Sequence, residues 1–207
     1  MLKLCNFRKI IFKDAIYTII LAISFLFISA IIDSISIMTP FKERYENSMQ
    51  RFISSEATAL IVFTIVVAAP IFEEFVFRGL IFGTMLENQM NIYLAVIIQA
   101  LLFGLFHSNL YQGMFAFFIG VFSALVLYWT NSIWNSIIFH ATVNSFRLIG
   151  LLFMSDKVAN AENNSSIKGS IFMLIILGIA LMYKPMRYFY KRKSEIRNKS
   201  KEELSPS

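Results

Sequence analysis

Apolar stretches long enough to cross a lipid bilayer recur along this chain of 207 residues. A membrane-spanning helix needs about 20 predominantly apolar residues. Here 57% of the residues are hydrophobic and only 15% are charged, whereas about a quarter of a soluble domain is charged. The sequence therefore predicts an all-α polytopic membrane protein, a bundle of about six transmembrane helices. We place these helices near residues 15–38, 57–86, 91–110, 112–130, 132–154 and 169–189.

Basic residues gather at the two ends of the chain. Four of the 19 Lys and Arg residues precede residue 15, and eight follow residue 183. Because cytoplasmic segments are enriched in Lys and Arg, an even number of spans places both termini in the cytoplasm. Residues 39–56 and 155–168 are then expected to be loops on the other side. We expect one membrane-embedded domain over 1–190, and a disordered, basic cytoplasmic tail over 191–207.

The same features limit the partners and the class of protein. A single cysteine excludes a disulfide framework and a cysteine-based metal site. The basic residues lie at membrane edges, where they attract anionic lipids, so the bilayer is the expected partner and nucleic acid is not. The composition, rich in Ile, Lys and Asn, favours a bacterial source and therefore the plasma membrane.

The stretch PIFEEFVFRG, which begins at Pro70, puts three ionisable side chains inside the second predicted span. On a helix, Glu74 and Arg78 are four residues apart and share a face, so they are predicted to form an ion pair. Glu73 points about 100° away and is left for another partner. Pro70 has no backbone N–H, so we expect the carbonyl of Val66 to lack its helical donor and the helix to be irregular there.

Both histidines of the chain lie in later predicted spans. His107 follows Phe103 by about one helical turn, and His140 precedes Asn144 by one turn. Arg147 extends the second pair into a polar stripe. Because ionisable groups are costly in lipid, we expect these side chains to face one cavity inside the bundle. Small residues suited to close helix packing support such a bundle: Gly104, Ala116, Gly120 and Ala124.

The residues alone leave several roles open. Any single histidine or amide can be a structural contact between helices, and a buried ion pair can be a structural tie. The whole set on three helices favours an ion path or a reaction centre. A carboxylate and an imidazole can deprotonate a water, while a second imidazole and an amide donate to an oxyanion. A divalent metal activating the water is an alternative, although the H-E-x-x-H motif is absent. A proton-coupled transporter is another, but the chain lacks the internal repeats typical of that class.

The patterns E-E-x-x-x-R, F-x-x-x-H and H-x-x-x-N, in this order on successive predicted helices, resemble the CPBP family. This family groups CAAX prenyl proteases of the Ras-converting type with bacteriocin-processing and self-immunity proteins, also called the Abi family. The resemblance covers residues 62–150, less than half of the chain. It implies an intramembrane endopeptidase that acts on a membrane-associated peptide or protein, by CAAX-type, bacteriocin or signal-peptide processing.

The resemblance also implies roles for the motif residues. Glu73 and His107 would activate the water, and His140 and Asn144 would stabilise the oxyanion. Glu74 would support the site together with Arg78 and Phe103. The family is often described as metalloproteases, and zinc held by Glu73, His107 and His140 is one alternative; we favour a metal-free mechanism. A non-catalytic self-immunity or regulatory protein of the same fold is the alternative to a protease.

Overall fold

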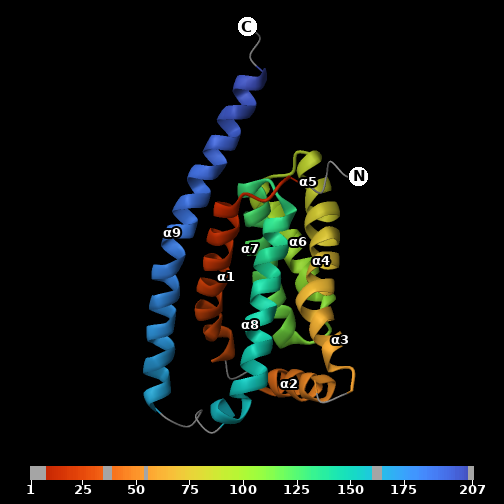
Figure 1. Cartoon of the computed structure of the whole chain (residues 1–207), viewed down its shortest axis with the longest axis vertical. Coiled ribbons are helices and arrows are strands. Elements are labelled where there is room, and N and C mark those ends of the chain that lie inside the picture. Colours follow the sequence, from red (N-terminus) through yellow and green to blue (C-terminus); the bar gives the residue numbers. More distant parts are fainter. Residues whose placement is uncertain (1–7, 35–38, 54–55, 160–164, 205–207) are drawn as a thin grey trace.

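The computed structural model describes residues 8–34, 39–53, 56–159 and 165–204. Within these ranges the chain is a bundle of helices joined by short turns (Figure 1). Two π-helical segments join α3, α4 and α5 into one continuous helical stretch. The elements are α1 Phe12–Asp33, α2 Thr39–Ile53, α3 Thr58–Phe63, η2 Thr64–Ala68, α4 Ala69–Glu74, η3 Phe75–Phe82, α5 Gly83–Glu87, α6 Ile92–Phe106, α7 Leu110–Thr130, α8 Ile133–Ala159 and α9 Ser165–Leu204.

The predicted class, an all-α polytopic membrane protein, is confirmed. In the described part of the chain, four helical stretches are long and apolar enough to cross a membrane: Phe12–Asp33, Thr58–Glu87, Leu110–Thr130 and Phe172–Asn198. Apolar side chains such as Leu105 and Phe172 are exposed by 79% and 63%, as lipid-facing residues would be. The total of six spans stays a prediction, because α6 has only 15 residues and α8 is not among the four.

The helix that carries the two adjacent glutamates is irregular on both sides of them. The six residues of α4 lie between the π-helical segments η2 and η3. Pro70, at the start of α4, cannot donate a backbone hydrogen bond, so a regular α-helix cannot continue unchanged through it. The irregularity expected before Pro70 is therefore present, as a π-helical turn. Such turns are frequent at functional sites, because they redirect the side chains that follow.

Residues 39–56 were predicted as a loop, and this prediction was wrong. The structure has α2 there, lying across one end of the bundle (Figure 1). The side chains of Phe41, Tyr45 and Met49 repeat every four residues and are half-buried, while Asn47 between them is exposed. This periodicity makes α2 an amphipathic helix, too short and too charged to register as a span.

The basic tail was predicted as disordered from residue 191, but α9 continues through Leu204. Lys, Arg and Glu are good helix formers, and extending an existing helix requires no new nucleus. Arg192 lies 3.6 Å from Glu195, one turn further along. The predicted 155–168 loop is likewise largely helical, since α8 runs to Ala159 and α9 begins at Ser165. Residues 160–164 and 205–207 lie outside the described part of the chain.

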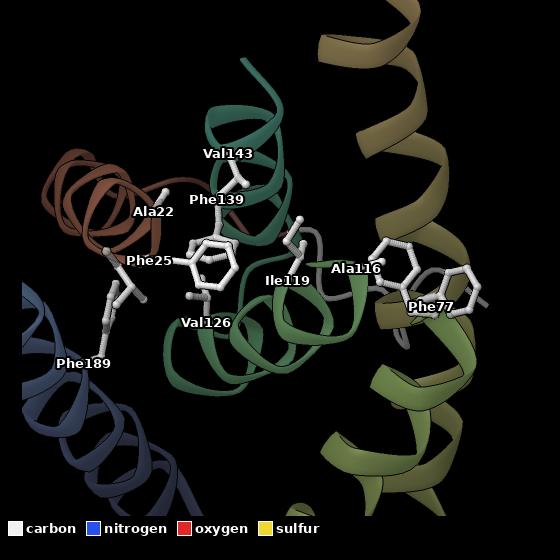
Figure 2. Close-up of a cluster of buried hydrophobic side chains, with 11 residues drawn as sticks. Ala22, Phe25, Phe77, Ala116, Ile119, Val126, Phe139, Val143 and Phe189 are labelled. Carbon is white, nitrogen blue, oxygen red and sulfur yellow. The ribbon is translucent and has the colours of Figure 1, made fainter. Parts of the chain in front are cut away.

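Close packing between α6 and α7 sets the position of the segment that carries His107. A Cβ atom at Gly104 would lie 2.8 Å from the carbonyl oxygen of Gly113, and one at Gly120 would lie 2.9 Å from the Cα of Ala100. The close approach predicted for both glycines is thus confirmed. Figure 2 shows the apolar core that holds α8 against α1 and α7, to which Phe139, the residue before His140 in the chain, belongs.

Candidate active site

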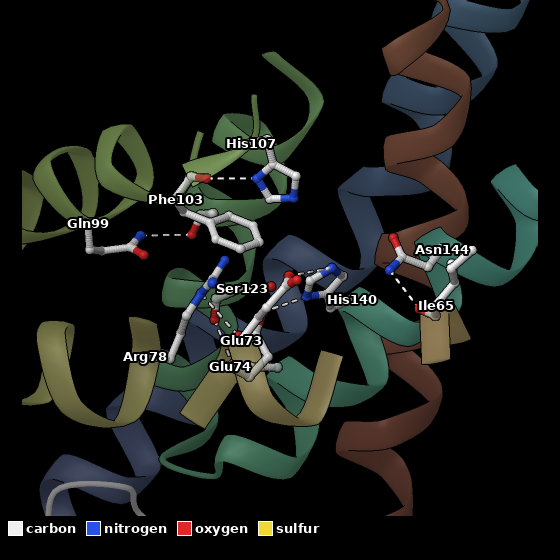
Figure 3. Close-up of polar contacts among 12 residues, drawn as sticks. Ile65, Glu73, Glu74, Arg78, Gln99, Phe103, His107, Ser123, His140 and Asn144 are labelled. Atoms are coloured by element: carbon white, nitrogen blue, oxygen red, sulfur yellow. Dashed lines mark hydrogen bonds and ion pairs between the residues drawn. The ribbon is translucent and has the colours of Figure 1, made fainter. Parts of the chain in front are cut away.

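Three buried side chains form a continuous row of polar contacts between α4, η3 and α8. The Nε of Arg78 lies 3.0 Å from Oε2 of Glu74, so the predicted ion pair is present. The Nδ1 of His140 lies 2.8 Å from Oε1 of the same carboxylate (Figure 3). Because an ionised carboxylate only accepts hydrogen bonds, Nδ1 of His140 is the donor. Glu74 therefore orients the imidazole and fixes the position of one proton, a contact that the motif spacing did not predict.

Glu73 faces the other nitrogen of the same imidazole. Its Oε2 lies 3.7 Å from Nε2 of His140, and its side chain is 15% exposed whereas that of Glu74 is fully buried. The exposed part of Glu73 lines a cavity of about 710 Å³, which we call the active-site cavity. The two adjacent carboxylates thus have different surroundings: one is held behind His140, and the other is accessible from the cavity.

His107 is held in one tautomer by its own helix. Its Nδ1 lies 2.9 Å from the carbonyl oxygen of Phe103, and a carbonyl can only accept. In neutral His107 the Nε2 atom is therefore an acceptor. The Phe103 ring contacts His107 and His140 edge to face, with ring centroids 5.0 and 5.7 Å apart, and the guanidinium of Arg78 lies 4.4 Å from its centre. Phe103 is thus a spacer that packs against both histidines and Arg78.

Asn144 connects α8 to the irregular helix. Its Nδ2 donates to the carbonyl oxygen of Ile65 at 3.0 Å. In π-helical geometry a carbonyl pairs with the N–H five residues later, which for Ile65 would be the missing N–H of Pro70. The carbonyl that accepts a side-chain hydrogen bond is thus that of Ile65. The sequence analysis assumed α-helical spacing and therefore predicted that the carbonyl of Val66 would lack its donor. The second N–H of the Asn144 amide remains for another acceptor.

The active-site cavity collects the predicted residues from several helices. Glu73, His107, His140 and Asn144 all line it, whereas Glu74 and Arg78 lie behind them, fully buried. Arg147 also lines it, and its guanidinium lies 3.5 Å from the centre of the Phe115 ring. The Tyr111 hydroxyl accepts from Arg147 at 3.4 Å and donates to Asp33 at 2.5 Å. The positive charge of Arg147 is therefore balanced through Tyr111 by Asp33.

A layer of buried polar side chains surrounds the site, and the motifs of the sequence indicated Asn135 in it but not Gln99 or Ser123. Gln99 is fully buried and donates to the carbonyls of Val96 and Gly120, at 3.0 and 2.9 Å. Ser123 and Asn135 are also fully buried, and their side-chain polar atoms have no hydrogen-bond partner among the described residues. Scanning the predicted spans for amides would have found Gln99, since a buried amide in lipid is costly unless it is bonded.

The alternative mechanism would place zinc between Glu73, His107 and His140. No three His, Cys, Asp or Glu side chains within the described ranges lie close enough together to hold a metal ion. The Nδ1 atoms of His107 and His140 are occupied by the Phe103 carbonyl and by Glu74. Both Nε2 atoms are left for either role, so zinc stays an alternative prediction. The mechanism proposed below uses the carboxylates, imidazoles and amide alone.

Fold and site together define a polytopic membrane protein with carboxylate and imidazole groups in one intramembrane cavity. Residues 55–146, a little under half of the chain, match the family of type II CAAX prenyl endopeptidases called Rce1-like. This match confirms the resemblance to the CPBP family that the three motifs predict, and it runs from α3 into α8, so that it includes all three motifs.

Two curated bacterial proteins are similar to the chain. One, from Bacillus subtilis, is named as a putative membrane peptidase, YdiL; it is 30% identical over 50% of this chain and 42% of its own length. The other is the membrane-embedded CAAX protease MroQ of Staphylococcus aureus, 26% identical over 61% of this chain and 53% of its own length. The chain thus spans about half the length of the relatives it matches. No solved structure matches the chain at a significant level.

Proposed function

We propose that this chain is an intramembrane endopeptidase that hydrolyses a peptide bond of a membrane-associated protein or peptide. One observation carries the proposal: Glu73, His107, His140 and Asn144 line a single cavity, with the buried Glu74–Arg78 pair behind His140. Carboxylates and histidines of this kind are costly in lipid and mark reaction centres. The similarity to membrane peptidases supports the same conclusion.

Glu73 is the proposed general base. A water held between its carboxylate and Nε2 of His107 loses a proton to Glu73 as its oxygen attacks the carbonyl carbon. His107 can accept from this water because its Nδ1 proton is committed to the Phe103 carbonyl. When the C–N bond breaks, Glu73 returns the proton to the leaving amine. The products are a carboxylic acid and an amine, and the base ends in its starting state.

His140 and Asn144 are the proposed donors to the oxyanion. Since Nδ1 of His140 donates to Glu74, the ring donates through Nε2 when it carries both protons, and the buried Glu74 carboxylate stabilises that cation. Asn144 has one N–H bonded to Ile65 and one remaining for the oxyanion. Each such donor contributes on the order of 100- to 1000-fold in rate.

The substrate is then a peptide reached within the membrane, in CAAX-type, bacteriocin or signal-peptide processing. One test serves all three substrate classes. Membranes of bacteria expressing the parent chain and the variants Glu73→Gln and Glu87→Gln are compared by labelling and sequencing new protein N-termini. Glu87→Gln is the matched control, because Glu87 is an exposed carboxylate outside the cavity.

We expect a set of new N-termini that the parent and Glu87→Gln share and that Glu73→Gln lacks. If the parent and Glu73→Gln give the same N-termini at normal expression of both, the chain is not a protease of this mechanism. A self-immunity or regulatory role of the same fold would then be the better account.

A further inference from the structure

The residues that line the active-site cavity extend from Glu73 to one end of the bundle. No described residue that lines it comes from α5 or α9. Toward its mouth the lining residues are Asp33 at the end of α1, Lys42 and Tyr45 of α2, Tyr111 and Gln112 in the first turn of α7, and Leu151 of α8. Figure 1 shows α2 lying across this end, and residues of α2 line the cavity there.

The start of α1 and the C-terminal part of α9 lie at the opposite end of the bundle (Figure 1). The Ser132 hydroxyl donates to the backbone carbonyl of Arg8 at 3.0 Å, and Arg192 lies 3.3 Å from Asp14 near the start of α1. Lys193 donates to the carbonyl of Tyr128 at 2.9 Å. The described parts of the N-terminal and C-terminal basic segments are therefore held together at one end of the bundle, far from α2.

The two ends of the bundle differ in charge. The segments before residue 15 and after residue 183 carry twelve of the 19 Lys and Arg residues. On α2, three basic residues (Lys42, Arg44 and Arg51) are offset by Glu43 and Glu46, with Asp33 and Glu56 in the flanking segments. Since cytoplasmic segments carry the excess of Lys and Arg, the end with the two termini is the cytoplasmic one.

We propose that the active-site cavity opens on the extracytoplasmic face, and that its substrate is a peptide segment presented from the outer side of the membrane. This inference rests on the proposed protease function. A segment confined to the cytoplasmic leaflet would have no route to Glu73, because the mouth beside α2 is at the other surface. The substrate class is therefore a translocated or membrane-anchored peptide rather than a cytoplasmic one.

The depth of Glu73 in the bundle sets how many substrate residues must be unwound and where in the substrate cleavage falls. Glu73 follows Thr58, the first residue of α3, by 15 positions, which corresponds to roughly 22 Å along a helix. An extended chain covers about 3.3 Å per residue, so about seven residues of unwound substrate are needed to reach Glu73 from the α2 surface. Cleavage is then expected about seven residues inside the outer membrane boundary of the substrate, not in its water-exposed part.

The amphipathic helix α2 forms the rim of this entrance. The Asn109 amide donates to the Phe41 carbonyl at 2.9 Å, and the rings of Tyr45 and Tyr111 lie 5.8 Å apart. Helices with one apolar and one charged face lie in the plane of the membrane surface. The rim thus lies at the level of the lipid headgroups, where an outer-leaflet peptide would meet it.

Cysteine accessibility in intact cells tests the orientation. The natural thiol is removed by Cys5→Ser, and single cysteines are introduced by Asn47→Cys on α2, Gln112→Cys in the cavity, Asn88→Cys after α5 and Asn198→Cys on α9. Asn47, Asn88 and Asn198 are exposed, and Gln112 lines the cavity outside the proposed catalytic residues. A membrane-impermeant maleimide is applied to bacteria that have no outer membrane, before and after permeabilisation.

We expect Asn47→Cys and Gln112→Cys to be labelled in intact cells, and Asn88→Cys and Asn198→Cys only after permeabilisation. The reverse pattern overturns the proposal, as does a Gln112→Cys thiol that reacts only from the cytoplasm or only after denaturation. Labelling requires no catalysis, and cleavage in detergent requires no particular orientation. A wrong orientation and a wrong protease assignment therefore give different results.

Discussion

Replacing Arg78 by methionine tests how the buried site is held together. Methionine keeps an unbranched, flexible side chain but removes the guanidinium that lies 3.0 Å from Glu74. Both residues are fully buried, so Glu74 would be left as a buried carboxylate with His140 as its remaining close partner. Breaking a buried ion pair by removing one partner costs about 3–5 kcal/mol. We expect Arg78→Met to lower the free energy of unfolding by this amount.

The assay is unfolding in mixed micelles by increasing SDS, followed by tryptophan fluorescence. The control is Arg44→Met on the exposed face of α2, which should stay within about 0.5 kcal/mol of the parent. Adding Glu74→Gln to Arg78→Met should restore much of the loss, because a neutral amide needs no counter-charge and can still accept from His140. If Arg78→Met is as stable as Arg44→Met, or the double variant is no more stable than Arg78→Met, the ion-pair reasoning is wrong.

Three further outcomes are expected. Gly104→Ala should lower the free energy of unfolding by about 1–3 kcal/mol, because the added Cβ would lie 2.8 Å from the Gly113 carbonyl oxygen. Gly150→Ala is the control and should not lower it, because a Cβ there has no atom within 4 Å. Equal stability of the two variants in the SDS assay would contradict the close packing of α6 and α7. Asn144→Ala should reduce the cleavage rate on the order of 100- to 1000-fold in purified protein, and an unchanged rate would remove this residue from the oxyanion site. Cleavage should survive thorough chelation; loss of activity that zinc alone restores would establish the metal-dependent alternative for Glu73, His107 and His140.

The intramembrane polar residues made much of the site predictable. Because charged groups are costly in lipid, the few that occur at membrane depth were expected to share a cavity, and Glu73, His107 and His140 do. The i, i+4 spacing likewise predicted the Glu74–Arg78 pair. The catalytic roles of these residues remain predictions that the experiments above address.

Contacts between different helices could not be predicted from the sequence patterns. The hydrogen bond from His140 to Glu74 depends on how α8 is rotated against α4, which the motif spacing does not determine. The acceptor for Asn144 is Ile65 because η2 is a π-helical turn, and the sequence indicated only that Pro70 disturbs the helix. The helix α2 was missed because its short amphipathic pattern is overlooked by a search for long apolar stretches.

The central claim is that Glu73 deprotonates the attacking water, and its most direct test is a rate ratio. Purified parent, Glu73→Gln and Glu87→Gln proteins are reconstituted in liposomes with a peptide identified by the N-terminal labelling experiment, and cleavage is measured under single-turnover conditions. Glutamine keeps the shape of Glu73 but cannot take up the proton, so the rate should fall on the order of 100- to 10,000-fold, with Glu87→Gln unchanged. Equal rates for the parent and Glu73→Gln would contradict the account.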